Sequence, residues 1–286
     1  MEAFRVQGLV LAALCIVANL SSSPPKRVVS LAPSITEIVY ALGAGDTLVA
    51  KTRYCTFPEE ARRLPDIGGI TDPSIEAILA QSPDLVLVSH LTPKPAYGQL
   101  KGKGASVLPV TGKGIDGIYG NIRIVADALG KGKEGMELSA KIRHGLENLK
   151  RQASDIQEGR RPKALMLLGA GSYFCAGQES FSGEILDLVG AENAAPQGKQ
   201  RWPQVSMEHI LARDPDVIIV SLAHEQQELK AAWQQKKDWQ SDPLWQHIGA
   251  VKNNRVYFLR DNLLVIPGPR IADAATMLFQ HIHGHN

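Results

Sequence analysis

Ser74-Ile-Glu76-Ala-Ile-Leu-Ala-Gln-Ser-Pro83-Asp84-Leu-Val-Leu-Val-Ser89 recurs further along the chain as Ser206-Met-Glu208-His-Ile-Leu-Ala-Arg-Asp-Pro215-Asp216-Val-Ile-Ile-Val-Ser221. Nine of the sixteen positions are identical at a constant offset of 132 residues. A second echo, Glu37-Ile-Val-Tyr-Ala-Leu-Gly43-Ala44, returns as Glu184-Ile-Leu-Asp-Leu-Val-Gly190-Ala191 at an offset of 147. This period is too long for a solenoid and indicates two copies of one domain. A groove between two such lobes is a natural place for a ligand.

Within each copy, short apolar strands alternate with helices, which predicts an α/β fold with a parallel sheet covered on both faces. A capping box is predicted at Ser34 and Glu37, with apolar residues at helical intervals behind it and Gly43 ending the helix. The predicted strands cover residues 27–31, 49–51, 85–89 and 106–110 in the first copy and 164–168, 217–221 and 256–259 in the second.

A long amphipathic helix is predicted between the two copies. It places Leu138, Ile142, Leu146 and Leu149 on one face, and at 1.5 Å per residue it spans about 30 Å, enough to join two lobes. The expected organisation is a signal peptide over 1–23, an N-terminal lobe over 24–130, the connecting helix over 131–158 and a C-terminal lobe over 159–286. The chain has 286 residues, so each of its two lobes is long enough to bury its own core.

The N-terminus predicts an exported protein. Arg5 precedes a mostly apolar stretch over 6–20, and Ser21–Ser23 offers small residues for cleavage. The net charge of +2 is spread along the sequence without a basic run, so nucleic acid is not an expected partner.

Cysteine and histidine leave several alternatives open. Cys55 and Cys175 are expected on loops, one in each half of the chain. Three alternatives are open for them: free thiols, a disulfide, or soft metal ligands. His281, His283 and His285 form an H-x-H-x-H tail that is expected to be solvated, with weak metal affinity at best.

Four motifs carry a family resemblance. The segments 27–37, Tyr54-Cys-Thr-Phe-Pro58, the Pro83-Asp84-Leu strand entry and Arg201-Trp-Pro-Gln-Val-Ser206 resemble the cobalamin-binding periplasmic proteins. More broadly, the chain resembles the helical-backbone (class III) substrate-binding proteins of ABC importers, which also carry haem and ferric siderophores. The resemblance implies two Rossmann-like lobes joined by one rigid helix, a periplasmic location, and capture of a bulky metal chelate between the lobes.

The ligand site is expected on loops that follow the carboxyl ends of the strands, where open α/β sheets leave their crevices. Tyr54 and Trp202 match family positions that stack on a corrinoid, and a flat macrocycle favours aromatic walls. The candidate residues are Pro33, Ser34, Tyr54, Ile70 and His90 in the first lobe and Ser172, Tyr173, Phe174, Trp202, His224 and Asp261 in the second.

Glu76 and Glu208 have a separate predicted role. In the family, the matching glutamates dock onto arginines of the membrane permease, and an exposed carboxylate accepts a bidentate arginine well. The alternative is that glutamate simply favours the first turn of a helix, where the dipole stabilises it. Its repetition in both copies favours docking to a permease dimer by a monomeric protein.

Cobalamin or a related corrinoid is the first expectation for the ligand, with no bound cofactor and no metal ligated by the protein. His90 and His224 each follow a strand and would ligate iron if haem were bound, although polar loop histidines are the simpler interpretation. Basic residues in the cleft would favour a ferric siderophore, and the motif loops show only Arg53 and Arg201. No G-x-x-x-x-G-K-[ST], G-x-S-x-G or H-E-x-x-H occurs, so an enzyme is not expected.

Overall fold

The structure is a computed structural model that describes residues 23–156, 161–222, 226–259 and 262–284. The predicted signal segment lies outside these ranges except for Ser23, as do His224, Asp261 and His285. No helix in the described part of the chain is long and apolar enough to cross a membrane.

The N-terminal lobe is built on a four-stranded parallel sheet in the order β2-β1-β3-β4. Its helices connect successive strands, as parallel pairing requires. The elements are β1 (Val28–Ser30), α1 (Pro33–Ala41), η1 (Gly45–Thr47), β2 (Leu48–Lys51), η2 (Glu59–Arg63), α2 (Ile75–Ala80), β3 (Leu85–Ser89), α3 (Lys94–Gly102), β4 (Val107–Val110) and α4 (Gly114–Ala128).

The C-terminal lobe repeats this topology in a second parallel sheet, β6-β5-β7-β8. The predicted duplication and fold class are therefore confirmed, because in both sheets the second strand along the chain forms one edge and the first, third and fourth strands follow it in that order. The elements are β5 (Lys163–Leu168), α6 (Phe181–Leu188), β6 (Glu192–Asn193), α7 (Met207–Arg213), β7 (Val217–Ser221), α8 (Gln226–Ser241), η3 (Trp245–His247), α9 (Gly249–Lys252), β8 (Val256–Leu259), η4 (Asn262–Leu264) and α10 (Ile271–His283).

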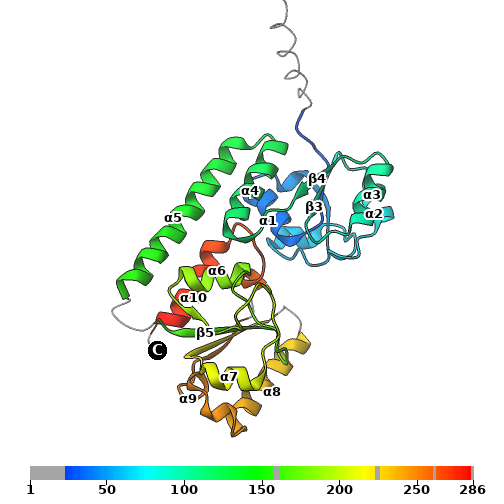
Figure 1. Cartoon of the computed structure of the whole chain (residues 1–286). Coiled ribbons are helices and arrows are strands. Elements are labelled where there is room, and N and C mark those ends of the chain that lie inside the picture. Colours follow the sequence, from blue (N-terminus) through cyan, green and yellow to red (C-terminus); the bar gives the residue numbers. More distant parts are fainter. Residues whose placement is uncertain (1–22, 157–160, 223–225, 260–261, 285–286) are drawn as a thin grey trace, which may run out of the picture.

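Helix α5 (Gly132–Ile156) runs alongside both lobes (Figure 1). Its 25 residues extend about 37 Å at 1.5 Å per residue. It packs against α4 at one end and against α6 and α10 further along. Gly145 permits the close approach to α10, because a Cβ there would lie 3.1 Å from the Cβ of Ala272.

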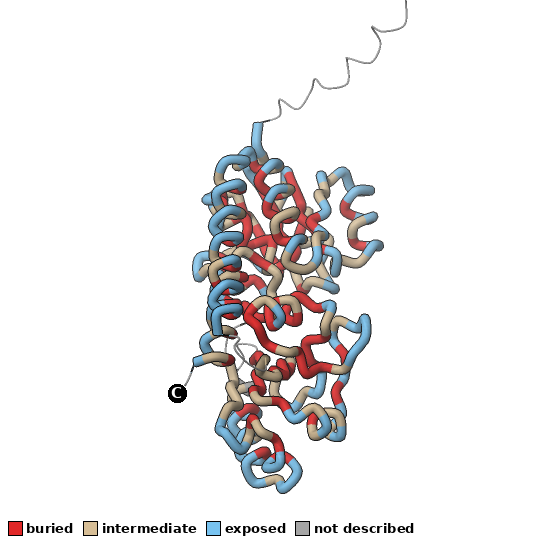
Figure 2. Tube along the Cα trace, turned by 60° about the vertical axis from the view of Figure 1, so that its left-hand side comes forward, coloured by how far each residue is buried: buried red, intermediate tan, exposed pale blue. Residues whose placement is uncertain are grey.

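The core is continuous across the lobe boundary, which differs from the expectation of a separate core in each lobe. One cluster contains strand residues from both sheets, such as Leu87 and Met166, together with α1, α4, α5, α6 and α10. The opposite face of each sheet has its own smaller cluster, around Ile78 in the first lobe and Trp239 in the second. Figure 2 shows buried residues running through both lobes. The lobes are therefore joined by packed side chains as well as by a helix.

Two local predictions are wrong. Helix α1 begins at Pro33 after an extended Ala32 without a side-chain cap, so Ser34 and Glu37 form no capping box. Glu37 instead lies buried and pairs with a distant arginine, described below. The histidine tail is not wholly solvated: His281 and His283 are half-buried at the end of α10, where His283 Nε2 lies 2.7 Å from the Val189 carbonyl oxygen.

Candidate functional site

Large apolar side chains are exposed on the loops that follow the strands of both lobes. Ten large hydrophobic residues are exposed in the described part of the chain, and six of them lie on these loops, so their exposure is concentrated rather than scattered. We call these six residues the interlobe patch: Tyr54, Phe57, Leu91, Tyr173, Phe174 and Trp202. Exposed apolar side chains that are grouped in this way are typical of binding surfaces.

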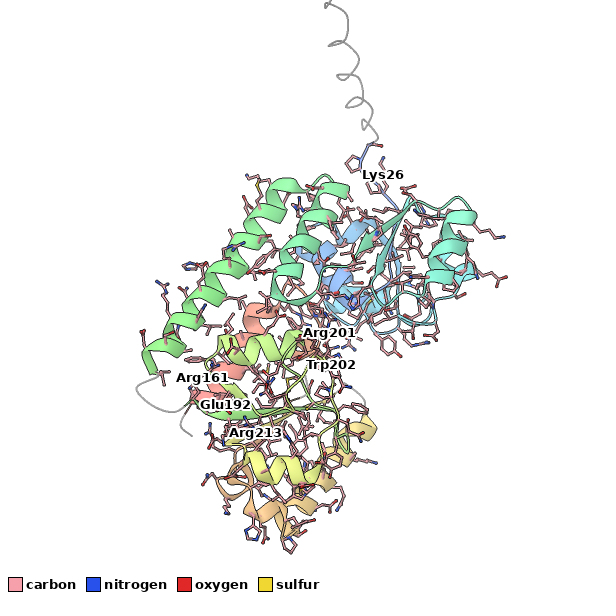
Figure 3. The ribbon with its side chains drawn as sticks, in the orientation of Figure 1. Lys26, Arg161, Glu192, Arg201, Trp202 and Arg213 are labelled. Atoms are coloured by element: carbon pink, nitrogen blue, oxygen red, sulfur yellow. The ribbon has the colours of Figure 1, made fainter. Side chains whose placement is uncertain are left out.

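Members of the patch lie at the boundary between the lobes: the ring of Phe57 in the first lobe lies against the Arg270 guanidinium of the second. Arg201 and Trp202 lie between the two lobes in Figure 3. The backbone of Ser34, in the first turn of α1, also reaches the second lobe, since a Cβ on Gly268 would lie 3.6 Å from its Cα. The start of α1, which follows the carboxyl end of β1, therefore approaches the other lobe.

The predicted ligand residues fall on both sides of this boundary. Pro33, Ser34, Ile70 and Ser172 are half-buried, whereas His90, Tyr54, Tyr173, Phe174 and Trp202 are exposed. His224 and Asp261 lie outside the described residues. The roles of all these residues in ligand binding stay predictions.

Four further residues of the candidate site were missed by sequence reasoning. Phe57 lies inside the Tyr54–Pro58 motif and Leu91 directly follows His90. Both could have been found from their position next to residues that the sequence did single out. Lys113 lies between two glycines and gave no pattern of its own. Arg270 could not be found locally, because its partner is in the other lobe.

His90 is surrounded by positive charge. His90 is exposed as a residue, but partial desolvation of its imidazole, followed by the charges of Lys113 and Arg201, holds the pKa of the ring below its ordinary value, so the neutral form predominates at pH 7. Lys113 comes from the loop before α4 and Arg201 from the other lobe, so cationic groups approach His90 from both sides of the boundary. Neither cation forms an ion pair with a carboxylate within the described ranges.

Glu37 and Arg270 form a bidentate ion pair across the boundary. Arg270 Nε and one terminal nitrogen donate to the two Glu37 carboxylate oxygens at 3.0 and 2.8 Å. The glutamate side chain is 3% exposed and the arginine side chain 17%. The same guanidinium lies 4.0 Å from the ring centroid of Phe57, which connects this buried pair to the interlobe patch.

The pseudo-equivalent glutamate, Glu184, also reaches across to the other lobe. Its carboxylate accepts a hydrogen bond of 2.7 Å from the backbone N–H of Ile115, in the first turn of α4. Gly114, at φ +66°, leaves room for this contact, because a Cβ there would lie 2.4 Å from a Glu184 oxygen. In each copy of the repeated Glu-Ile segment, the glutamate therefore binds a group of the other lobe.

Two of the nine identical pairs in the sixteen-residue repeat, a serine and an aspartate, make the same kind of hydrogen bond in both copies. Ser74 and Ser206 cap their helices by accepting hydrogen bonds of 3.2 and 3.1 Å from backbone N–H groups three residues on. Asp84 accepts from the backbone N–H groups of Lys26 and Arg27, and Asp216 accepts from that of Lys163. These aspartates fix the starts of the central strands in the two sheets.

Glu76 and Glu208 are identical in the two copies but make no such hydrogen bond among the described residues. Both side chains are exposed in the first turn of their helices, and neither carboxylate has a hydrogen bond or ion pair in the described part of the chain. An exposed carboxylate in each lobe, related by the internal repeat, is available to another molecule.

Cys55 and Cys175 are free thiols, so the disulfide alternative is wrong. Both are buried, and the Sγ atom of Cys55 lies 3.1 Å from the Thr36 hydroxyl and 3.2 Å from that of Thr52. Burial raises the pKa of Cys175 to about 11. No group of three or more histidine, cysteine, aspartate or glutamate residues that could hold a metal occurs among the described residues.

Comparisons with known proteins identify the class. The profile of the periplasmic binding protein family matches residues 28–263, and the chain belongs to this family. It is 30% identical over 264 residues to a substrate-binding lipoprotein of a Bacillus subtilis ABC transporter, covering 91% of this chain and 80% of that one. A vitamin B12-binding protein of Vibrio campbellii is 27% identical over 265 residues, with 92% of each chain covered.

Among solved structures, the periplasmic haem-binding protein of Roseiflexus sp. RS-1 in apo form superimposes with a TM-score of 0.80 and 28% identity, covering 92% of this chain and 98% of that one. The protein is therefore a substrate-binding protein of ABC-importer type. Its relatives are transport proteins rather than enzymes, and the family and the lipoprotein relative imply export.

Proposed function

We propose that this protein captures a flat, metal-centred macrocycle between its lobes in the periplasm, with cobalamin or a related corrinoid as the first candidate. The interlobe patch is the observation that carries this proposal, since both lobes contribute exposed aromatic rings to it. Aromatic and aliphatic walls suit a large planar ligand because they remove its apolar faces from water. A vitamin B12-binding relative supports the corrinoid.

A preformed site supports tight binding. The shared core and the Glu37–Arg270 pair hold the lobes together without a ligand. Binding then costs little conformational free energy, so more of the contact free energy appears as affinity.

Haem is the second candidate, favoured by the neutral His90 and the cations near it. A neutral imidazole nitrogen is available to ligate iron, and Lys113 and Arg201 would pair with the carboxylates of haem. The Roseiflexus haem-binding structure supports this alternative. A ferric siderophore with carboxylate groups follows, because the same cations would attract it.

Delivery to a permease dimer is assigned to Glu76 and Glu208. The two carboxylates occupy matching positions of the internal repeat, one in each lobe, which suits a partner with two equivalent subunits. Arginines on the permease would bind them in bidentate fashion. The protein would act as a monomer that performs no chemistry on its cargo.

The experiment is an equilibrium titration of the purified protein and two tryptophan variants with cyanocobalamin. Trp202→Ala removes a ring of the interlobe patch, and Trp233→Ala removes an exposed tryptophan on α8 as the matched control. We expect Trp202→Ala to lose about 2 kcal/mol of binding, roughly 30-fold in Kd, for about 80 Å² of lost apolar contact. Equal affinity of the two variants would remove Trp202 from the site.

A further inference from the structure

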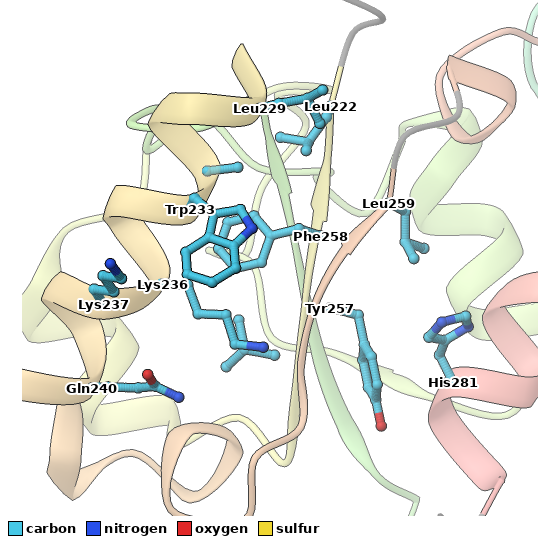
Figure 4. Close-up of a pocket in the computed structure, with 12 residues that line it drawn as sticks. Leu222, Leu229, Trp233, Lys236, Lys237, Gln240, Tyr257, Phe258, Leu259 and His281 are labelled. Atoms are coloured by element: carbon cyan, nitrogen blue, oxygen red, sulfur yellow. The ribbon is translucent and has the colours of Figure 1, made fainter. Parts of the chain in front are cut away.

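A hollow lies in the C-terminal lobe, and none of the residues that line it belongs to the interlobe patch. It has a volume of about 590 Å³ and lies along β8, with α8 on one side and the end of α10 on the other (Figure 4). Trp233 and Phe258 form one wall, and Tyr257 and His281 form the other. Trp233 is 70% exposed, and the Lys237 ammonium lies 5.1 Å from the centroid of its ring. We call this hollow the β8 groove.

The floor of the β8 groove is the open edge of a sheet. Among the described residues, strand β8 pairs with β7 alone and is the last strand of its sheet. The carbonyls of Arg255 and Leu259 accept hydrogen bonds from the backbone N–H groups of Ile218 in β7 and of Leu222, the residue after β7. Because backbone groups alternate along a strand, the N–H and C=O groups of Val256 and Phe258 point to the open edge. An added strand could pair with them.

The duplicated lobe shows that the other equivalent edge is protected. Strand β4 is the last strand of the first sheet, as β8 is of the second. Pro109 occupies in β4 the register position that Phe258 occupies in β8. Proline on an edge strand removes the outward N–H donor and blocks pairing with another chain. The edge at β4 is therefore blocked by proline, whereas the equivalent edge at β8 can pair with an added strand.

The charge of the groove selects among occupants. Lys236 and Lys237 line it, and no carboxylate does so within the described residues. A second copy of this chain added edge to edge about a two-fold axis would bring four lysines together, which like-charge repulsion opposes. A membrane surface could satisfy the lysines but not the backbone groups of the edge. An extended acidic segment satisfies both.

We propose that the β8 groove is a docking site for an extended, acidic segment of a partner protein, which adds to the sheet as a strand beside β8. Alternate side chains of such a strand would point to opposite faces, one set toward Trp233 and Phe258 and the other toward Tyr257 and His281. Carboxylates at its rim would pair with Lys236 and Lys237. None of the residues that line the groove belongs to the interlobe patch, and neither Glu76 nor Glu208 is among them.

The test uses a defined probe, the capped peptide (Glu-Val)₄, with (Lys-Val)₄ and (Glu-Pro)₄ as controls for charge and for backbone donors. Calorimetry gives the affinity, and amide hydrogen exchange reports on Val256 and Phe258. We expect (Glu-Val)₄ alone to bind and to slow exchange at these two amides. Lys236→Glu with Lys237→Glu should weaken binding at least tenfold. The matched control, Lys141→Glu with Lys252→Glu at exposed positions elsewhere, should change it less than twofold.

Several results would overturn the proposal. The proposal is wrong if (Glu-Val)₄ does not bind, or if (Lys-Val)₄ or (Glu-Pro)₄ binds equally well. It is also wrong if (Glu-Val)₄ binds without slowing amide exchange at Val256 and Phe258. Concentration-dependent dimerisation in sedimentation that Trp233→Ala abolishes would assign the groove to a second copy instead. Binding to phosphatidylglycerol vesicles that the lysine reversal abolishes, with no peptide binding, would assign it to a membrane surface.

Discussion

Arg270 and Glu37 lie 233 residues apart in the sequence and form a bidentate ion pair across the boundary between the lobes. The pair is nearly buried, and the Arg270 guanidinium also lies against the ring of Phe57. One arginine of the second lobe therefore fixes both the first helix of the other lobe and an aromatic ring of the candidate ligand site.

Replacing Arg270 should be costly. In Arg270→Leu the Glu37 carboxylate keeps its burial and loses its partner, so we expect unfolding in urea to become easier by about 3–5 kcal/mol. The double variant Glu37→Leu/Arg270→Leu should recover part of this loss, because no unpaired charge stays buried. The control is Arg62→Leu, which breaks an exposed pair with Glu59 and should cost less than about 1 kcal/mol. Similar losses for both single variants would show that the interlobe pair is not special.

Glu76 and Glu208 should matter for transport and not for ligand binding. We expect Glu76→Ala/Glu208→Ala to abolish uptake in cells that depend on this protein, because the permease loses both anchors. Ligand affinity measured by titration should be unchanged. Glu147→Ala, an exposed glutamate on α5, serves as the control and should transport normally. A double variant that loses its ligand would refute the docking role.

Alkaline pH should destabilise the protein through Cys175. Burial raises its pKa to about 11 from the ordinary value of 9.0, so the unfolded thiol ionises first as pH rises. The stability from this protonated thiol is complete below pH 9 and is lost up to about pH 11, amounting to about 2–3 kcal/mol for two pKa units. Urea unfolding of the wild type and Cys175→Ala should therefore differ in pH dependence over this window. If the free energy of unfolding depended on pH in the same way in both proteins, the burial of this thiol would be contradicted.

His90 offers a spectroscopic test of the boundary. Its lowered pKa predicts an imidazole titration midpoint below 6.5, followed by NMR of the ring protons. Arg201→Met should raise the midpoint only part of the way, since burial is the larger cause. An unchanged midpoint in Arg201→Met would show that the two lobes do not approach as described. Lys252→Met, remote from this boundary, is the control.

The fold was largely predictable because its signals are local and occur twice. Ser74 and Ser206 cap helices, and buried strands follow in both copies, so each half supports the interpretation of the other. Helix α8 was not predicted, because its glutamine- and lysine-rich sequence has a weak apolar face. The Ser34–Glu37 spacing suggested a capping box, but the partner of Glu37 lies at the far end of the chain and no local pattern reveals it. The same reason hid Arg270 from the candidate site.

The central claim is capture of a metal-centred macrocycle between the lobes. The most direct measurement is calorimetric titration of the purified protein with cyanocobalamin, with hemin titrated in parallel and followed by its absorption spectrum. The account predicts tight one-to-one binding of cyanocobalamin without a hemin response. A hemin spectrum with axial ligation and no cobalamin binding would transfer the site to haem and to His90. Silence from both ligands would contradict the claim.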